Sequence, residues 1–134
     1  MVCIYCSGET RVVNSRPKKR TRQTWRRREC KDCESIFTTV ESIELSGSVL
    51  VKYANNDTAP FVREKLYISV YNSLKHRKDA QTSAIALTDT IISRILPLIT
   101  NAQLPCSEIA VTTYKILSNF DKPASVYYRS YHLN

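Results

Sequence analysis

The sequence is poor in glycine, since only Gly8 and Gly47 occur among its 134 residues. Motifs such as GxxxxGK[ST], GxGxxG and GxSxG need glycines at close, fixed spacing, because the backbone must turn sharply or approach a ligand closely. The two glycines lie too far apart to form any of these motifs. A bound nucleotide must therefore be held by Lys and Arg side chains and helix N-terminal amides, without a glycine-rich loop.

Histidine is equally scarce, with only His76 and His132 in the chain. Neither lies at a spacing typical of a metal site or an activated nucleophile. The carboxylates are scattered, which indicates surface charge and not a general acid and base pair. The sequence therefore predicts a protein that is not an enzyme.

Long apolar runs are also missing. The most apolar segment, 84–99, is interrupted by Thr, Asp, Ser and Arg residues and by Pro97. The N-terminus has no charged region followed by an apolar one, as a secretory signal would have. We expect a cytoplasmic protein without a membrane partner, in a reducing compartment where cysteines remain thiols.

Four of the five cysteines form two Cys-x-x-Cys pairs separated by 23 residues. Two such turns complete a tetrahedral site with sulfur about 2.3 Å from one metal ion. A redox dithiol is the main alternative, but thioredoxin-like sites carry a single pair in a βαβ unit, a pattern that is not present. The sequence predicts a structural Zn²⁺ ion with four ligands: Cys3, Cys6, Cys30 and Cys33.

The metal also explains how the N-terminal segment folds. About 35 residues cannot bury enough apolar surface to fold unaided, and bound zinc supplies the missing free energy. We expect Trp25 and Phe37 to form a miniature core beside the metal, with Gly8 adopting a turn conformation. Cys106, the fifth cysteine, is expected to be a small buried apolar residue.

Positive charge is concentrated between the two cysteine pairs. Residues 11–28 hold nine Lys or Arg residues and no acidic one, whereas 48–134 hold ten against six. A solvated loop is the alternative interpretation, but both ends of this run are fixed to the metal site and it contains Trp25. We predict nucleic-acid contacts from these basic residues: Arg11, Arg16, Lys18, Lys19, Arg20, Arg26, Arg27 and Arg28.

The apolar pattern divides the chain into two modules, 1–45 and 48–134. The first contains expected strands at 11–14, 24–28 and 36–40, with an exposed loop at 16–24. The second contains a hairpin over 49–60 and helices at 62–74, 82–96, 107–119 and 124–131, with Ser107 as an N-cap. The predicted fold class is a small α+β two-module protein, a rubredoxin-like zinc ribbon followed by a mostly helical domain with a β-hairpin.

These motifs follow one another in an order that resembles the NrdR family, the bacterial repressors of ribonucleotide reductase genes. The matching residues are Cys3-x-x-Cys6, Asn14-Ser15-Arg16, Arg26-Arg27-Arg28-Glu29-Cys30-x-x-Cys33, Phe37-Thr38-Thr39, Glu41, Val51-Lys52, Pro60-Phe61 and Lys65-Leu66. The resemblance runs across nearly the whole chain.

The resemblance implies a ribbon that binds double-stranded DNA at promoter boxes of reductase genes, and an ATP-cone that binds ATP or dATP. Nucleotide state in this family is coupled to the size of a homo-oligomer and so to DNA affinity. The implied nucleotide contacts are Leu50, Val51, Lys52, Tyr53, Phe61, Lys65, His76 and Arg77. Tyr53 and Ala59 depart from the family pattern.

The prediction is therefore a nucleotide-responsive, zinc-dependent transcriptional repressor. Two alternatives remain open. Tyr53 and Ala59 favour a nucleic-acid-binding ribbon whose helical domain only oligomerises, with Lys52 and Lys65 as ordinary solvated lysines. The other alternative is an allosteric subunit that binds a protein partner.

Overall fold

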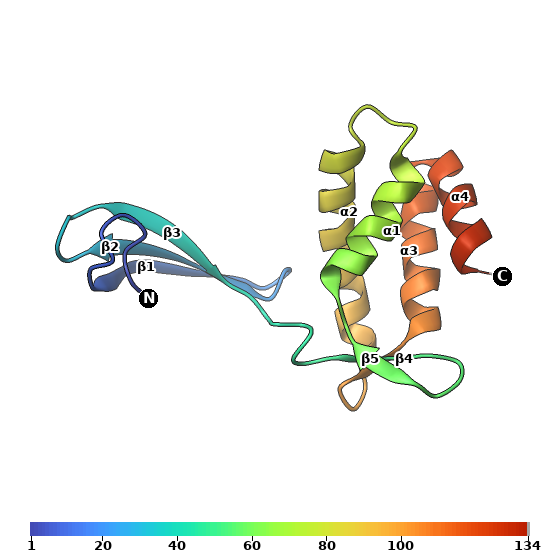
Figure 1. Ribbon diagram of the computed structural model, residues 1–134, viewed down its shortest axis with the longest axis horizontal. Coiled ribbons are helices and arrows are strands. Elements are labelled where there is room, and N and C mark those ends of the chain that lie inside the picture. Colours follow the sequence, from blue (N-terminus) through green and yellow to red (C-terminus); the bar gives the residue numbers. More distant parts are fainter. Residues whose placement is uncertain (134) are drawn as a thin grey trace. The chain divides into compact units, whose positions relative to one another are not determined.

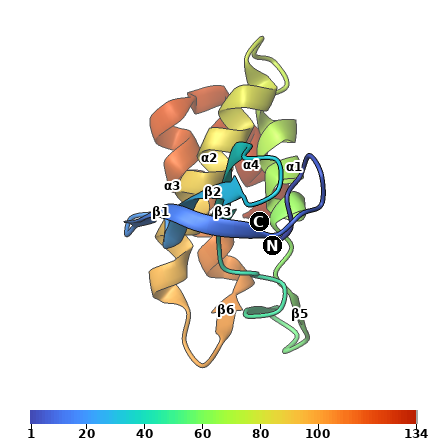
Figure 2. The same cartoon turned by 90° about the vertical axis from the view of Figure 1, so that its left-hand side faces the viewer.

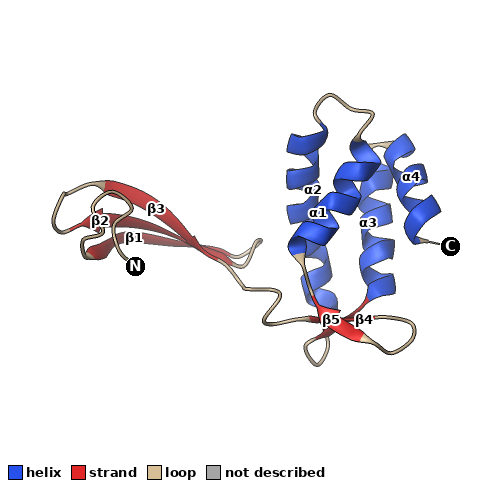
Figure 3. Ribbon diagram, in the orientation of Figure 1, coloured by secondary structure: helices blue, strands red, loops and turns tan. Residues whose placement is uncertain are grey.

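The computed structural model describes residues 1–133, which form two compact units, the first spanning Met1–Ile43 and the second beginning at Glu44 (Figure 1). The first unit is built of strands and turns, and the second combines helices with a small sheet (Figure 3). The predicted fold class, a small α+β protein with an N-terminal ribbon and a helical C-terminal part, is confirmed.

The first unit is an antiparallel sheet with strand order β1-β2-β3. Its strands are β1 (Thr10–Lys18), β2 (Gln23–Cys30) and β3 (Ile36–Glu41). The prediction of a loop over 16–24 is wrong. β1 continues to Lys18, which pairs with Gln23 at the start of β2, so the connecting turn is only 19–22. Charged side chains reach solvent from either face of a strand, so charge does not prevent pairing. Pro17 is tolerated because β1 is an edge strand.

The core of the first unit is very small. Three residues are buried in it, Cys3, Cys30 and Phe37. Phe37 is thus where we expected it, but Trp25 is only half-buried. Because Phe37 lies opposite Arg28, strand alternation directs Trp25 to the other face of the sheet. The expectation that Trp25 shares the core with Phe37 is therefore wrong.

Gly8 serves a different purpose from the one expected. Its backbone is not in the left-handed region. A Cβ atom at this position would overlap Oδ2 of Asp32, so a larger residue would require the exposed Asp32 side chain to move.

The second unit contains a three-stranded sheet with order β5-β4-β6. It consists of β4 (Leu50–Lys52), β5 (Thr58–Pro60) and β6 (Gln103–Pro105). The β4–β5 hairpin follows the sequence prediction, and β6 joins β4 in parallel. In both views the sheet lies at one end of the helices (Figures 1 and 2).

The helices agree with the predicted ranges to within two residues at each end. They are α1 (Arg63–Leu74), α2 (Ala80–Ile95), α3 (Cys106–Phe120) and α4 (Lys122–His132), and the short 3₁₀ helix η1 (Leu96–Leu98) follows α2. Pro97 ends the regular helix at η1. Ser107 is not an N-cap, because α3 already begins at Cys106 after Pro105. No helix among residues 1–133 is long and apolar enough to cross a bilayer.

The core of the second unit is formed by all four helices and the sheet. Fifteen buried residues contribute to it. Five of them, from several elements, are fully buried: Val70, Leu74, Ile91, Leu104 and Leu117. Ile85 of α2 lies outside this core, and 51% of it is exposed. It lies one position past the buried Ala84, so the helical turn directs it to solvent.

Candidate functional site

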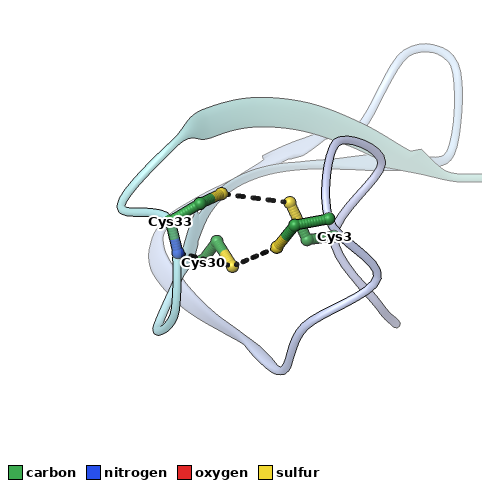
Figure 4. Close-up of side chains that lie close together, drawn as sticks. Cys3, Cys30 and Cys33 are labelled. Atoms are coloured by element: carbon green, nitrogen blue, oxygen red, sulfur yellow. Dashed lines mark hydrogen bonds between the residues drawn. The ribbon is translucent and has the colours of Figure 1, made fainter.

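Four cysteine sulfur atoms converge in the first unit, drawn from the loop before β1, the end of β2 and the turn before β3 (Figure 4). All four Sγ atoms lie within 4.8 Å of one another. The Sγ atoms of Cys3 and Cys33 are 3.7 Å apart, and those of Cys6 and Cys30 are 3.5 Å apart. A tetrahedron with sulfur about 2.3 Å from zinc has edges of about 3.8 Å, so this donor set fits the metal.

The two Cys-x-x-Cys turns have the same internal geometry. The N–H of Tyr5 donates to Sγ of Cys3, and the N–H of Asp32 donates to Sγ of Cys30, each at 3.4 Å. The residue after each second cysteine is left-handed, with φ 62° at Ser7 and 60° at Glu34. Amide donors of this kind stabilise thiolates and fix the sulfur positions around a metal.

The thiols are not equivalent in the absence of a cation. Hydrogen bonds from the side chain and backbone of Ser35 lower the pKa of Cys33 to about 6. The Gly8 backbone lowers the pKa of Cys6, but hydrogen bonding with Cys30 and Cys33 outweighs it and raises the value to about 12. Adjacent thiolates repel one another, and a divalent cation removes that cost, so this cluster suits Zn²⁺.

The eight basic residues predicted to contact nucleic acid all lie on β1, on β2 and in the turn that connects them. Arg11 is bound to Glu29, whose Oε2 accepts from Nη2 at 2.7 Å. Most of the others project into solvent without an ion-pair partner among residues 1–133: Arg16, Lys18, Lys19, Arg20 and Arg27. The hairpin therefore carries an uncompensated positive field.

The second unit has two adjoining pockets between the sheet and helices α1, α3 and α4. The inner pocket has a volume of about 250 Å³ and is mostly apolar, with Val51, Phe61, Lys65 and Tyr128 in its wall. The outer pocket, of about 760 Å³, is lined by Lys52, Asn56 and Ser107 among others. Four residues line both pockets: Tyr53, Cys106, Ala110 and His132.

Most of the predicted nucleotide contacts meet at these pockets. Val51, Tyr53, Phe61 and Lys65 line the inner one, and Lys52 lines the outer one. Leu50 precedes them on β4 but lines neither pocket. The structure therefore brings Lys52 and Lys65 to one region, as a phosphate site requires.

His76 and Arg77 are not brought to this region. They follow the C-terminal end of α1, whereas Lys65 lies in its first turn, and the helix between Lys65 and Leu74 is about 14 Å long. Nη1 of Arg77 donates to Oδ2 of Asp121 at 2.9 Å, and Nε2 of His76 lies 3.1 Å from the same carboxylate. Their location does not support the expected nucleotide contact, because the length of α1 separates them from both lysines.

Three pocket residues come from segments that sequence reasoning did not assign to a site. Cys106 is half-buried in the pocket wall. Tyr128 and His132, one turn apart on α4, stack with ring centroids 4.2 Å apart. Partial burial lowers the pKa of His132, which favours the uncharged form of its imidazole. No motif marks these residues, because only the packing of α4 against α1 and α3 brings them to the pocket.

Comparison with known proteins supports the ribbon and extends over most of the chain. Residues 1–41 match a family model described as "Transcriptional repressor NrdR-like, N-terminal domain". A protein of Lachnoclostridium phytofermentans named Transcriptional repressor NrdR is 32% identical, with 97% of this chain and 84% of the relative aligned. Proteins of the same name from Phenylobacterium zucineum and Agrobacterium fabrum are 34% and 33% identical, over 97% of this chain and 83% and 81% of their own lengths.

Proposed function

The chain belongs to the NrdR family of transcriptional repressors, and from that membership we propose that it represses ribonucleotide reductase genes in response to adenine nucleotides. The observation that carries the proposal is the four-cysteine cluster, which fixes both ends of a strongly basic β-hairpin. In this proposal residues 1–45 bind zinc and DNA, and residues 48–134 bind nucleotide and oligomerise.

The DNA contacts are assigned to the basic hairpin. Phosphate contacts by Lys and Arg provide affinity, and arginine forks also recognise base edges. Because such contacts release counterions, affinity is expected to fall steeply as salt rises. The zinc ligands Cys3, Cys6, Cys30 and Cys33 position the hairpin and take no direct part in recognition.

The nucleotide contacts are assigned to the two adjoining pockets. The inner pocket offers apolar and aromatic walls for a base, and Lys52 and Lys65 offer two ammonium groups for phosphates. Neither ammonium group has an ion-pair partner in the described part of the chain. A pair of uncompensated lysines at the rim of an apolar pocket favours an anionic ligand such as ATP or dATP.

The homo-oligomer follows from the small size of the ribbon. A single three-stranded ribbon offers a limited DNA footprint, so specific binding needs at least two ribbons on one duplex. The nucleotide-binding unit is the proposed site of assembly, with ATP or dATP selecting between arrangements. Reciprocal coupling then requires that DNA also changes the affinity for the nucleotide.

The test is DNA binding by the zinc-loaded full-length chain. One duplex comes from the promoter of the reductase genes in its own genome, and the other is a scrambled sequence of equal length. Affinity and light-scattering mass are measured without nucleotide, with ATP and with dATP. We expect promoter preference, and a change of affinity together with mass when nucleotide is added. No promoter preference in any state would overturn the repressor proposal.

The lysines supply a matched control for the nucleotide part. K52A and K65A each remove a charge at the pockets, and K115A removes an exposed charge from α3, away from both. We expect about a tenfold or larger loss of dATP affinity for the first two variants, and little change for K115A. Equal losses in all three variants would show that net charge, and not a built site, attracts the nucleotide.

A second candidate function is a DNA-binding ribbon whose helical unit no longer senses nucleotide. Tyr53 favours it, because this ring occupies the wall of both pockets, where it narrows the space for a ligand. The same experiment separates the two functions, since this protein would prefer the promoter duplex and keep the same mass with or without dATP.

A further inference from the structure

The three consecutive arginines of β2 do not act on one surface. Side chains alternate between the faces of a strand, so Arg26 and Arg28 share one face and Arg27 occupies the other. The pairing register extends this division to the neighbouring strands, because directly opposed residues of an antiparallel sheet lie on the same face.

The first face, here the closed face, is defined by Arg26, Arg28, Phe37 and Thr39. Phe37 lies directly opposite Arg28 and is buried against the cysteine cluster. Nε of Arg28 donates to Oγ1 of Thr39 at 3.2 Å. Arg26 donates through Nη1 to Oγ of Ser15 at 3.2 Å, and its Nη2 lies 3.7 Å from Oε2 of Glu41. Both guanidinium groups of this face thus already have protein acceptors.

The second face, here called the open face, consists of Trp25, Arg27 and Glu29 of β2 together with the residues that pair with them on β1 and β3. On it Trp25 lies between Arg16 and Val40, Arg27 between Asn14 and Thr38, and Glu29 between Arg11 and Ile36. The Arg11–Glu29 pair confirms that these side chains share a face, and it cancels its own charge.

Arg27 is the exposed charge at the centre of the open face. It has neither a hydrogen bond nor an ion pair through its side chain among residues 1–133, and the same is true of Arg16. Asn14, opposite Arg27, accepts the N–H of Ser15 through Oδ1 at 2.8 Å. The side-chain nitrogen Nδ2 of Asn14 makes no hydrogen bond among residues 1–133, so it remains available as a donor.

We infer that the open face is the surface that reads DNA bases, with Arg27 as the main specificity-determining residue and Asn14 beside it. The inference rests on the proposed DNA binding. A free guanidinium fork matches the O6 and N7 acceptors of guanine, and the side-chain Nδ2 of asparagine can donate to N7 of adenine. The positive charges of Arg16 and Arg27 on the open face complement the negative phosphates of a duplex. Arg26 and Arg28 instead brace the ribbon and add a sequence-independent attraction to phosphates.

The test compares arginine variants of equal charge loss in the zinc-loaded full-length chain. R27A removes one positive charge from the open face. R26A and R28A each remove one positive charge from the closed face. R27K keeps the charge and loses the planar fork. Dissociation constants are measured for the reductase-promoter duplex and a scrambled duplex, and the ratio of the two reports sequence discrimination. Thermal unfolding and bound zinc are measured for every variant.

We expect R27A and R27K to lower the discrimination ratio by about tenfold to a hundredfold, with unchanged zinc content and unfolding temperature. R26A and R28A should weaken binding to both duplexes by a similar small factor, so that the ratio stays near that of the wild type. Their unfolding temperatures should fall, because hydrogen bonds within the closed face are lost. N14A provides a second, uncharged test of the open face and should lower the ratio by a smaller factor.

The outcomes separate the face assignment from the proposed function. If the wild type prefers the promoter duplex and R27A and R27K keep that preference, the assignment is overturned while the repressor proposal stands. The same follows if R28A loses discrimination as strongly as R27A while it retains zinc and stability. A wild type without promoter preference overturns the proposed function and the face assignment together.

Discussion

The two units of this chain solve the folding problem in opposite ways. The ribbon buries three residues, two of which are metal-binding cysteines, whereas the second unit buries a cluster of fifteen residues. Apolar burial contributes about 25 cal/mol per Å², so a core the size of the ribbon's cannot offset the entropy of ordering some forty residues. The ribbon therefore depends on its metal for folding, whereas the core of the second unit is large enough to stabilise its fold without a metal.

The same difference decides where each unit offers a binding surface. Nearly every side chain of β1 is exposed, so the ribbon offers an extended surface for contacts with a large partner. The second unit has enough packed volume to enclose pockets between its sheet and helices, which suit a small ligand. Removing one stabilising device at a time separates these roles.

Removal of the metal should have the largest effect. A structural zinc site contributes about 10 to 16 kcal/mol of binding free energy at neutral pH, so C30S or a strong chelator should unfold the ribbon and abolish DNA binding. The helical circular dichroism of the second unit should persist, because its core has no metal ligand. Zinc content, amide exchange of residues 1–43 and DNA affinity are the measurements.

C106S is the matched control, since Cys106 lies in the second unit and outside the metal cluster. It should keep zinc and ribbon protection. If C30S lost helical signal together with zinc, the expectation would be contradicted, because the fold of the second unit would then depend on the metal.

Removal of apolar volume should have the next largest effect, now confined to the second unit. Leu117 of α3 is fully buried, and L117A should lower the free energy of unfolding by about 2 to 5 kcal/mol. Zinc content should be unchanged. V111A is the control on the same helix, because Val111 is exposed and its truncation should cost about 0.5 kcal/mol or less. Zinc loss on L117A, or a similar cost for both variants, would contradict this expectation.

The features that sequence reasoning captured are those fixed by local spacing. Two Cys-x-x-Cys pairs allow little besides a tetrahedral metal site. Repeats of apolar residues at helical spacing located α1, α2 and α3, and Pro123 indicated the start of α4. These signals are contained within a few turns of the chain, so no knowledge of the tertiary fold was needed.

The features that it missed depend on partners distant in sequence. β6 is three residues long and becomes a strand only by pairing with β4, some fifty residues earlier. Trp25 could be placed on its face only once the register with β3 was known. Tyr128 and His132 join the pocket because α4 packs against α1 and α3, which no local pattern encodes.

His76 and Arg77 illustrate the same point and lead to the smallest of the three effects. Asp121, the N-cap of α4, accepts hydrogen bonds from the Ala124 N–H at 2.9 Å and from Arg77, and it contacts His76. Its side chain is only 7% exposed. Burial raises the pKa of Asp121, but the bonds from Ala124, Arg77 and His76 outweigh it, and the pKa is lowered. The cluster therefore ties the end of α1 to the start of α4.

We expect D121A to lower the free energy of unfolding of the second unit by about 2 to 3 kcal/mol at pH 7, and D121N by about 1 kcal/mol less, because asparagine still caps the helix. A lowered carboxyl pKa stabilises the fold above the ordinary value near 3.9, and the contribution is lost as pH falls through the lowered value. The gap between wild type and D121N should accordingly close in urea titrations as the pH falls below about 4. A gap that stays constant from pH 7 to pH 3 would show that Asp121 acts through its shape alone. Unchanged dATP affinity in D121N would confirm that His76 and Arg77 belong to this structural cluster and not to the nucleotide site.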